Sequence, residues 1–559
     1  MNTDVKQMVE INCVNTQTKI LVPSGITLKD VISFAGLKSQ EKILGACVNN
    51  KVQNLYYRMY FPKTIEFFDI NNIFGRKMYQ CSLMMLVYKA LKDTFHKAEL
   101  NVLHSMTGGY YAEVDNLEVD IEVFVEKLKK RMWELVEEDL PFERKVMLSQ
   151  EAEELFEKVG LKQKAQLIHS RKTLYTDIDI LGDTVNSFFF EMVPSTSYLN
   201  VWDIQPYEKG FIILMPDTEQ NNEKVSQPNN QKKMFSIFQE HQNWVNILGT
   251  PYITTLNKAV ELGYANQIIQ VSEALHEKKY AQIADAIYKK KDNVRFIFLA
   301  GPSSSGKTTS CRRLATQLMV LGIKPLQISL DDYFHNREHT PKDENGDYDF
   351  ECLEALDLDF FSKQMKQLMN GEEIELPRFN FVTGEREKTG KTIKMTEENI
   401  VIIEGIHALN PKLSKEIPRK NKYFVFVSAL TQIALDKHNL ISTRDNRLIR
   451  RIVRDHNYRG ASAERTLLMW KSVRKGEERH IFPFQENADS IFNSSLLYEI
   501  GVLKTYCEPL LLQVPKNSPA YANARRMLDF LNNFVAISPE SIPPTSVMRE
   551  FLGGSSFSY

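Results

Sequence analysis

The stretch from Ile297 to Thr309 constrains the fold of this chain more than any other, because it reads as strand, glycine-bounded loop and helix in direct succession. Residues 301–308, GPSSSGKT, satisfy the pattern G-x-x-x-x-G-K-[ST]. Gly301 and Gly306 permit a tight turn whose backbone N–H groups face one concavity, and the following helix adds the positive end of its dipole. Such a concavity binds phosphate oxygens. The sequence therefore predicts an α/β domain that holds a nucleoside triphosphate.

The residues of this loop have expected roles. Lys307 would reach the β- and γ-phosphates of ATP, and the hydroxyl of Thr308 would bind Mg²⁺. A chance match in a glycine-serine turn is the alternative, and the apolar strand before the loop and the helix after it weigh against it. The predicted ATP-binding residues are Gly301, Ser303, Ser304, Ser305, Gly306, Lys307, Thr308 and Thr309.

Two carboxylates follow predicted strands. The strand 326–330 ends in Asp331, and the strand 401–403 ends in Glu404. Ligands collect at the carboxyl ends of the strands in doubly wound sheets. Asp331 could therefore orient an acceptor hydroxyl and take its proton, while Glu404 could help hold Mg²⁺ directly or through water. A single strand-end acid is often a turn former, but two of them after a phosphate loop favour a site.

An arginine-rich helix is predicted around residues 447–459. Arg447, Arg451 and Arg454 recur at i, i+4 and i+7, which places three guanidinium groups on one helical face. Guanidinium groups match phosphate oxygens and stabilise the charge of a transferring phosphoryl group. A solvated basic helix or an RNA-binding face is the alternative. Because the same chain carries the phosphate loop, we expect a lid over the triphosphate, with Arg451 and Arg454 catalytic together with Asp331 and Lys307.

Composition limits the remaining classes. At 559 residues the chain predicts three or four domains, and 70 basic against 71 acidic residues leave no global charge that favours nucleic acid or acidic membranes. The six cysteines form no C-x-x-C pair, which is typical of a reducing compartment. No apolar run approaches eighteen residues, and the first residues lack a signal h-region. We expect a cytoplasmic protein with no membrane partner.

Residues 1–72 alternate short strands with one helix, for which Thr27 is a plausible N-cap. Through TKILVPSGITLKDV (18–31) and GACVNNKVQNLYYRM (45–59) this part resembles the TGS domain, which implies a small β-grasp fold.

Residues 73–220 then resemble the second additional domain of threonyl-tRNA synthetases, an α+β module that carries a zinc-type editing site in that family. Here residues 79–83 and 202–210 lack the histidine and cysteine pattern, so neither metal nor editing is expected. His104 remains as a lone polar candidate, and a structural role is the simpler interpretation. We interpret this part as a binding or assembly module.

The rest of the chain divides into a linker and helical bridge (221–290), the phosphate-loop domain (291–535) and a C-terminal tail (536–559). The tail could be disordered, or its Phe551, Phe557 and Tyr559 could dock it onto the body.

The phosphate-loop domain resembles the uridine kinase and phosphoribulokinase family. The shared segments are GPSSSGKTT, DDYF, YDFECLEALDL, PRFNFVTGER, VIIEGIHAL and RLIRRIVRDHNYRG, within residues 294 to about 480. The resemblance implies ATP- and Mg²⁺-dependent phosphorylation of a hydroxyl, with a nucleoside 5′-hydroxyl as the expected acceptor. It places Asp331 as catalytic base, Asp349 as the carboxylate that grips the ribose hydroxyls and Glu404 as the Mg²⁺-associated acid.

The same resemblance implies that Arg451, Arg454 and Arg459 are lid and substrate arginines. At Phe379 and Arg386 the chain keeps the residue types found in the substrate segment of the family. Gly384 stands where uridine-specific members carry a base-contacting histidine, and Ala461 replaces a family arginine. These departures put pyrimidine recognition in doubt.

As a whole the chain resembles multidomain bacterial proteins usually called nucleoside or uridine kinases. We expect ATP and a nucleoside as small-molecule partners, a homo-oligomer, and nucleic acid only through the N-terminal modules. A kinase for another small alcohol, such as a sugar or a vitamin precursor, is the nearest alternative, and an RNA- or tRNA-binding regulatory NTPase is the second. Asp349 weighs against an acceptor that is already phosphorylated.

Overall fold

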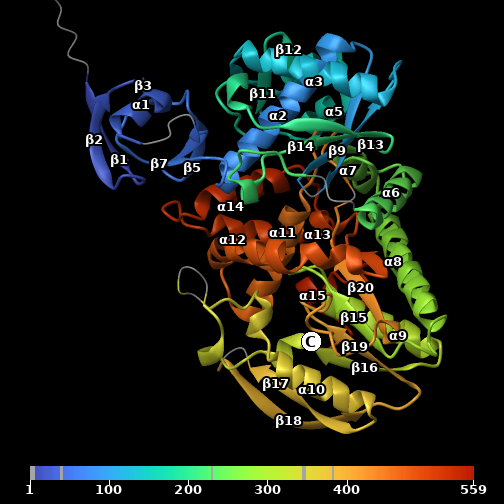
Figure 1. The fold of residues 1–559 in the computed structure, drawn as a ribbon. Coiled ribbons are helices and arrows are strands. Elements are labelled where there is room, and N and C mark those ends of the chain that lie inside the picture. Colours follow the sequence, from blue (N-terminus) through green and yellow to red (C-terminus); the bar gives the residue numbers. More distant parts are fainter. Residues whose placement is uncertain are drawn as a thin grey trace, which may run out of the picture.

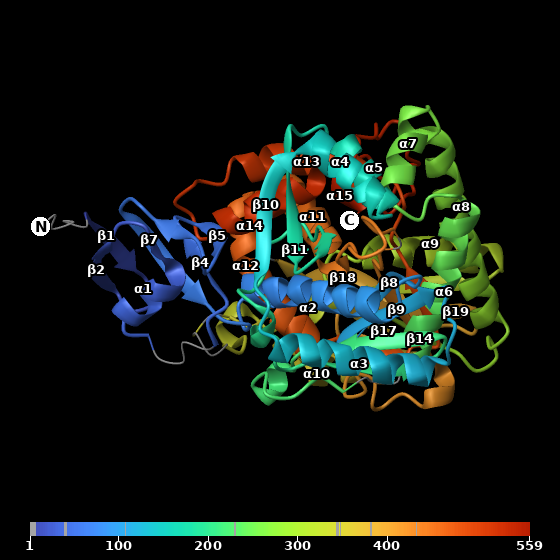
Figure 2. The ribbon, with the colours of Figure 1, turned by 90° about the horizontal axis from the view of Figure 1, so that it is seen from above.

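The computed structural model describes residues 7–558 apart from 38–41, 107, 228–230, 343–345, 347, 381–382 and 432. Figure 1 shows a small sheet-containing part in dark blue, a second part above the centre, and a lower part built on a parallel sheet. Seen from above, the small part stands at one end of the molecule (Figure 2). Within the described residues, no helix has the length and apolar character needed to cross a membrane.

The small part is a five-stranded sheet in the order β2-β1-β7-β4-β5, covered by one helix. Thr27 caps this helix, since its side chain accepts from the backbone N–H of Asp30 at 3.2 Å, as the sequence predicts. The β-grasp pattern of strands is present, while the relation to TGS domains stays a prediction. The elements are β1 (Met8–Cys13), β2 (Thr18–Pro23), α1 (Leu28–Phe34), β4 (Gly45–Val48), β5 (Lys51–Asn54) and β7 (Lys63–Phe68).

The second part packs two sheets around the long helix α2 (Ile73–Thr94), most of which is buried. His104 lies in β8 (Glu99–Met106) with its ring stacked on Phe238 at 4.1 Å between centroids. Burial lowers the pKa of His104 to about 3, so this ring is neutral and packs as a core residue. The other elements are β9 (Gly109–Asp115), α3 (Ile121–Glu137), β10 (Phe142–Leu148), α4 (Ser149–Lys158), α5 (Lys162–Arg171), β11 (Tyr175–Leu181), β12 (Thr184–Asn186), β13 (Asp203–Tyr207) and β14 (Gly210–Leu214).

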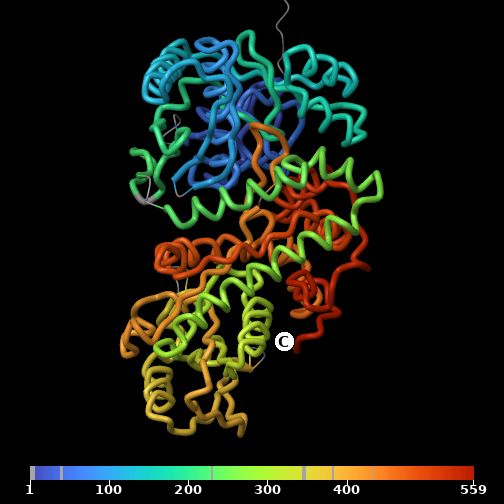
Figure 3. Tube along the Cα trace, turned by 90° about the vertical axis from the view of Figure 1, so that its right-hand side faces the viewer, coloured from blue at the N-terminus to red at the C-terminus, as the bar shows by residue number. Residues whose placement is uncertain are grey.

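Three helices, α6 (Lys232–Ile247), α7 (Ile253–Glu261) and α8 (Ala265–Tyr288), connect the upper and lower parts. Figure 3 shows this segment in green, running from one part to the other. The predicted bridge is therefore helical for most of its length, although the boundaries of the domains stay predictions.

The lower part contains a five-stranded sheet in the order β16-β19-β15-β20-β21, and all of its pairings are parallel. The strands are β15 (Phe296–Ala300), β16 (Lys324–Ser329), β19 (Asn399–Glu404), β20 (Lys422–Ser428) and β21 (Ser490–Asn493). Helix α9 (Lys307–Val320) follows the phosphate loop and packs against α8. The α/β fold with a mostly parallel sheet, preceded by smaller sheet-containing parts, is as predicted.

Further helices and a hairpin complete this part. They are α10 (Leu358–Met369), β17 (Glu373–Asn380), β18 (Glu385–Lys394), α11 (Thr443–Arg459), α12 (Ala463–His480), α13 (Glu499–Leu512), α14 (Tyr521–Leu531) and α15 (Arg549–Leu552). The C-terminal tail is docked, because Val547, Met548 and Phe551 are fully buried. Phe557 is half-buried, and Tyr559 lies outside the described residues.

A loop of the lower part, residues 433–441, inserts into the second part. Lys164 on α5 and Asp436 form an ion pair at 2.9 Å, with both side chains at most 2% exposed. The backbone N–H of Val102 also donates to the carbonyl of Lys437 at 2.8 Å. Because this loop directly precedes α11, the second part holds the segment that leads into the arginine-rich helix.

Replacing Asp436 with alanine should strip Lys164 of its buried counter-charge. Removing one partner of a buried pair costs about 3–5 kcal/mol, since the remaining charge is uncompensated. We expect the urea midpoint of tryptophan fluorescence to fall accordingly. Glu99→Gln is the matched control, because Glu99 pairs with the neighbouring Lys437 at the surface and such pairs contribute about 0–1 kcal/mol. Equal losses in the two variants would contradict the assignment.

Candidate active site at the phosphate loop

The loop between β15 and α9 has the geometry that its glycines predict. A Cβ on Gly301 would lie 2.1 Å from the carbonyl oxygen of Val427, so no larger residue fits. Gly306 has φ +82° and caps α9, a conformation that side chains rarely adopt. Ser304 also has a positive φ of +58°. The loop is thus tightly wound against β20, with its backbone fixed by sterics.

Polar groups of the loop fit a phosphate ligand. The hydroxyls of Ser304 and Ser305 are buried and have no hydrogen-bond partner among the described residues. A buried hydroxyl without a partner is costly, and a phosphate oxygen would accept from it. Among the described residues, the Nζ of Lys307 donates to the carbonyl of Pro302 at 3.1 Å, within the loop itself. Burial lowers the pKa of this lysine, whereas Glu404 and Asp331 act to raise it.

The strand-end acids meet at one edge of the sheet. Ser329 pairs in register with Glu404, and Asp331 follows Ser329 by two residues in a 3₁₀ turn. The hydroxyl of Thr308 donates to Glu404 Oε1 at 3.3 Å. Burial, reinforced by the charge of Asp331, raises the pKa of Glu404 to about 7. A hydroxyl and a carboxylate in contact, with a second carboxylate nearby, are the oxygen ligands that Mg²⁺ prefers, so the residues present fit that ion.

Three arginines gather around Asp455 on α11. Its carboxylate lies 3.2 Å from Arg451, 2.7 Å from Arg454 and 3.7 Å from Arg459. Arg451 also donates to the hydroxyl of Ser303 at 2.8 Å, which puts this cluster against the phosphate loop. One carboxylate cannot neutralise three guanidinium groups, so the cluster carries a net positive charge beside the loop.

Arg447 differs from the other arginines of the predicted face. It is 1% exposed and forms a buried ion pair with Glu477 on α12, and it donates to the carbonyl of Ser303 at 3.1 Å. Glu477 in turn accepts the backbone N–H of Ser303 at 2.9 Å. The sequence did not single out Arg450, which contacts the carbonyl of Ser304 at 3.4 Å and pairs with Glu499. Arg447 and Arg450 therefore support the loop from inside the core.

Two of the predicted acceptor residues, Phe379 and Arg386, are register partners in the β17–β18 hairpin, whereas Asp349 lies in a separate loop. One carboxylate oxygen of Asp349 accepts the N–H of Glu351 at 3.0 Å. Phe379 is 5% exposed on β17, with its ring 5.6 Å from that of Phe334. Arg386 on β18 forms an ion pair with Asp357 at 2.9 Å. The roles of these three residues toward a substrate stay predictions.

Arg337 fills the space beside Gly384. A Cβ on that glycine would lie 2.8 Å from Nε of Arg337, and the N–H of Arg337 donates to the carbonyl of Gly384 at 2.8 Å. A large side chain at position 384 is thus incompatible with this placement of the arginine. No sequence motif had pointed to Arg337.

The sequence also missed Glu351, Glu477 and Glu550. Burial, together with the charge of Glu477, raises the pKa of Glu351 to about 7. Glu550 in α15 contacts Thr309, which follows the loop. For Glu351 the signal was its place in YDFE, two residues after Asp349. Glu477 and Glu550 follow no strand and belong to no motif, so nothing in the sequence could have identified them.

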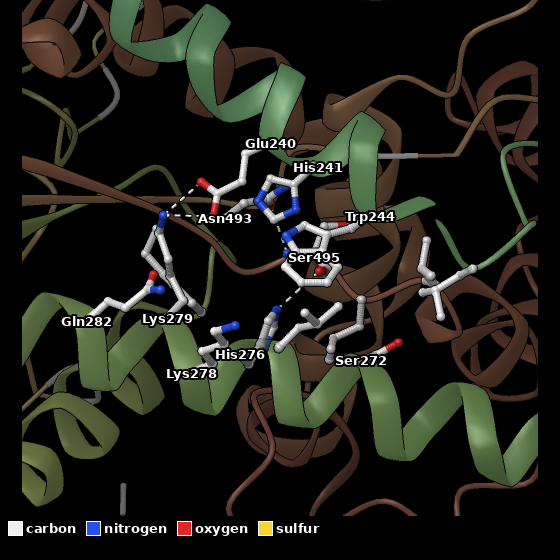
Figure 4. A pocket seen from close by; sticks show the side chains of 15 residues that line it. Glu240, His241, Trp244, Ser272, His276, Lys278, Lys279, Gln282, Asn493 and Ser495 are labelled. Atoms are coloured by element: carbon white, nitrogen blue, oxygen red, sulfur yellow. Dashed lines mark hydrogen bonds and ion pairs between the residues drawn. The ribbon is translucent and has the colours of Figure 1, made fainter. Parts of the chain in front are cut away.

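A separate cavity lies between α6, α8 and the segment after β21. Its lining includes Glu240, Trp244, His276 and Lys279 (Figure 4). His276 donates to the carbonyl of Ser495 at 3.2 Å, and burial, with the charge of Arg313, lowers its pKa well below 6.5. The cavity adjoins the segment whose Ser494 hydroxyl donates to the carbonyl of Ser305. One segment, residues 493–497, therefore lines this cavity and also contacts the phosphate loop.

Comparisons with known proteins match the part of the chain that contains this site. The model of the Phosphoribulokinase / Uridine kinase family matches residues 296–498. The uridine kinase of Borrelia duttonii (strain Ly) is 30% identical over 227 residues, which cover 38% of this chain and 95% of that protein. The uridine kinase of Staphylococcus haemolyticus (strain JCSC1435) is 28% identical over 200 residues, covering 36% of this chain and 87% of that one.

Among solved structures, a possible uridine kinase from Bacillus stearothermophilus matches with a TM-score of 0.27 and 18% identity, over 39% of this chain and 98% of that one. The family match spans the phosphate loop, both strand-end acids and the arginine-rich helix. The N-terminal resemblances found no support in these comparisons. The chain therefore belongs to the phosphoribulokinase/uridine kinase family and is a phosphotransferase with an alcohol acceptor.

Proposed function

We propose that the protein is an ATP-dependent nucleoside kinase that transfers the γ-phosphate to the 5′-hydroxyl of a nucleoside. The observation that carries this proposal is the meeting of Asp331, Glu404 and Thr308 at the edge of the sheet that faces the phosphate loop. A carboxylate beyond the γ-phosphate is what transfer to an alcohol requires. Relatives named uridine kinase support a nucleoside as the acceptor.

On the donor side, the backbone of residues 301–309 and the Nζ of Lys307 bind the phosphate oxygens. Arg451 and Arg454, which both belong to the Asp455 cluster, stabilise the negative charge on the phosphoryl group that is transferred. Thr308 and Glu404 would hold Mg²⁺, which when bound neutralises charge on the phosphates.

On the acceptor side, Asp331 orients the hydroxyl and accepts its proton as the new P–O bond forms. Asp349 would bind the ribose hydroxyls, because a carboxylate with one hydrogen bond still has several acceptor sites. Phe379, Arg386 and Arg459 would complete the acceptor side. Packing of α11 over the loop excludes water and so suppresses hydrolysis of ATP.

Replacing Asp331 with asparagine should remove the base and keep its shape. We expect transfer to fall by about 10²–10⁴-fold, the usual contribution of a positioned base, with ATP binding nearly unchanged. Asp332→Asn is the matched control, since the Asp332 carboxylate instead accepts the N–H of Phe379 at 3.1 Å. A rate above about a tenth of wild type in the Asp331 variant, measured by coupled ADP release, would refute its assignment as the base.

Binding of Mg²⁺ should weaken on acidification, because a protonated Glu404 is a poor metal ligand. With its pKa raised to about 7, the carboxyl is mostly ionised at pH 8 and mostly protonated at pH 6. We expect the Mg²⁺ affinity of the complex with an ATP analogue to fall by about tenfold over that interval. In calorimetric titrations, the Mg²⁺ affinity of Glu404→Gln should lose this pH dependence. An identical pH dependence in both proteins would exclude Glu404 as a metal ligand.

A panel of nucleosides and small alcohols tests the acceptor class. We expect ATP consumption to rise by at least about tenfold with one or more nucleosides, and Asp349→Asn to raise the KM for that nucleoside more than it lowers kcat. If only sugars or vitamin precursors raised ATP consumption, the acceptor would be another small alcohol. The assignment of the ATP-binding residues would then still stand.

A further inference from the structure

The C-terminal segment 543–552 reaches the phosphate loop. Glu550 in α15 accepts two hydrogen bonds through the same carboxylate oxygen, from the backbone N–H of Thr309 at 3.2 Å and from its hydroxyl at 2.6 Å. Figure 1 shows α15 near β15, the strand that leads into the loop. The segment is thus in direct contact with the last residue of GPSSSGKTT.

The position that Glu550 occupies suits a phosphate oxygen. The first N–H groups of a helix have no partner within the helix, and with the dipole they bind anions. In α9 the N–H of Ser310 is already bonded to the carbonyl of Gly306 at 3.0 Å, whereas that of Thr309 donates to Glu550. Phosphates of a bound nucleotide use the N–H groups of this loop. The Glu550 carboxylate that contacts Thr309 therefore occupies a position where a bound nucleotide would place a phosphate group.

The segment is held on several sides. Val547 packs against the loop, since a Cβ on Gly306 would lie 2.5 Å from its Cγ1. The carbonyl of Phe551 accepts from Asn457 on α11 at 2.9 Å. Ser546 donates to Glu273 on α8 at 2.5 Å. These contacts tie the segment both to the loop and to the helix that carries Arg451 and Arg454.

We propose that residues 543–552 form an intramolecular competitor of the nucleotide, with the Glu550 carboxylate taking a phosphate position on Thr309. The proposal rests on the proposed ATP site. Nucleotide phosphates and Glu550 exclude each other there by volume and by like charge. The apparent affinity for nucleotide is thus reduced by the fraction of molecules in which Glu550 has left, and nucleotide binding loosens the segment.

Full-length Glu550→Gln tests the competition, because it removes the charge and keeps the shape. Calorimetric titration with ADP and with a non-hydrolysable ATP analogue, without any acceptor, should show an apparent Kd lower than wild type by at least about fivefold, the lower end of typical coupling. Glu550→Ala should tighten binding at least as much. Glu540→Gln changes a residue of the same tail whose backbone N–H donates to the hydroxyl of Ser538, and this variant should bind as wild type does.

Unchanged or weaker nucleotide binding in both Glu550 variants would overturn the proposal and leave the kinase assignment standing. If wild type and variants all failed to bind nucleotide, the ATP site and the competition would both fall. Hydrogen exchange of wild type supplies a measurement that needs no variant. The backbone N–H groups of residues 545–552 should exchange faster with saturating ATP analogue, and equal or slower exchange would overturn the release of the segment.

Discussion

Parallel pairing of β15 with its neighbours is the constraint on which the site depends. Leu299 of β15 lies in register with Glu404 of β19, and Ser329 of β16 lies on the other side of Glu404. Because all the strands point the same way, the loop after β15 and the acids after β16 and β19 emerge at one edge. The buried strands thereby fix the positions of groups that have no other reason to be close.

Charge at this edge is arranged in opposing sets. The acids Glu404 and Asp331 lie near Lys307 of the loop, and the Asp455 cluster of arginines contacts the loop through Arg451 and Ser303. The arginine helix is held from outside the lower part as well, because the loop before it is bound by Lys164 and Val102 of the second part. The second part therefore helps to position the segment that leads into α11.

Local pattern was enough to predict the strands, loop and helix that carry the candidate donor-side residues. The glycines, Lys307 and the strand-end acids follow from short-range rules, since each is placed by the strand or helix in which it lies. Tertiary contacts decided the rest. Phe379 packs against the ring of Phe334, and Arg386 forms an ion pair with Asp357. Neither partner can be identified from the strand in which Phe379 or Arg386 lies. Glu477 and Glu550 reach the loop from 174 and 241 residues away, where no pattern along the chain can register them.

The ion pair between Lys164 and Asp436 also bears on how the chain is made. Its partners are separated by 272 residues, and the chain is synthesised from the N-terminus, with domains folding as they emerge. Until Asp436 has been made, the ammonium group of Lys164 lacks its buried counter-charge and favours water over the interior. The second part therefore reaches its final packing only after the phosphate loop and both strand-end acids have been synthesised.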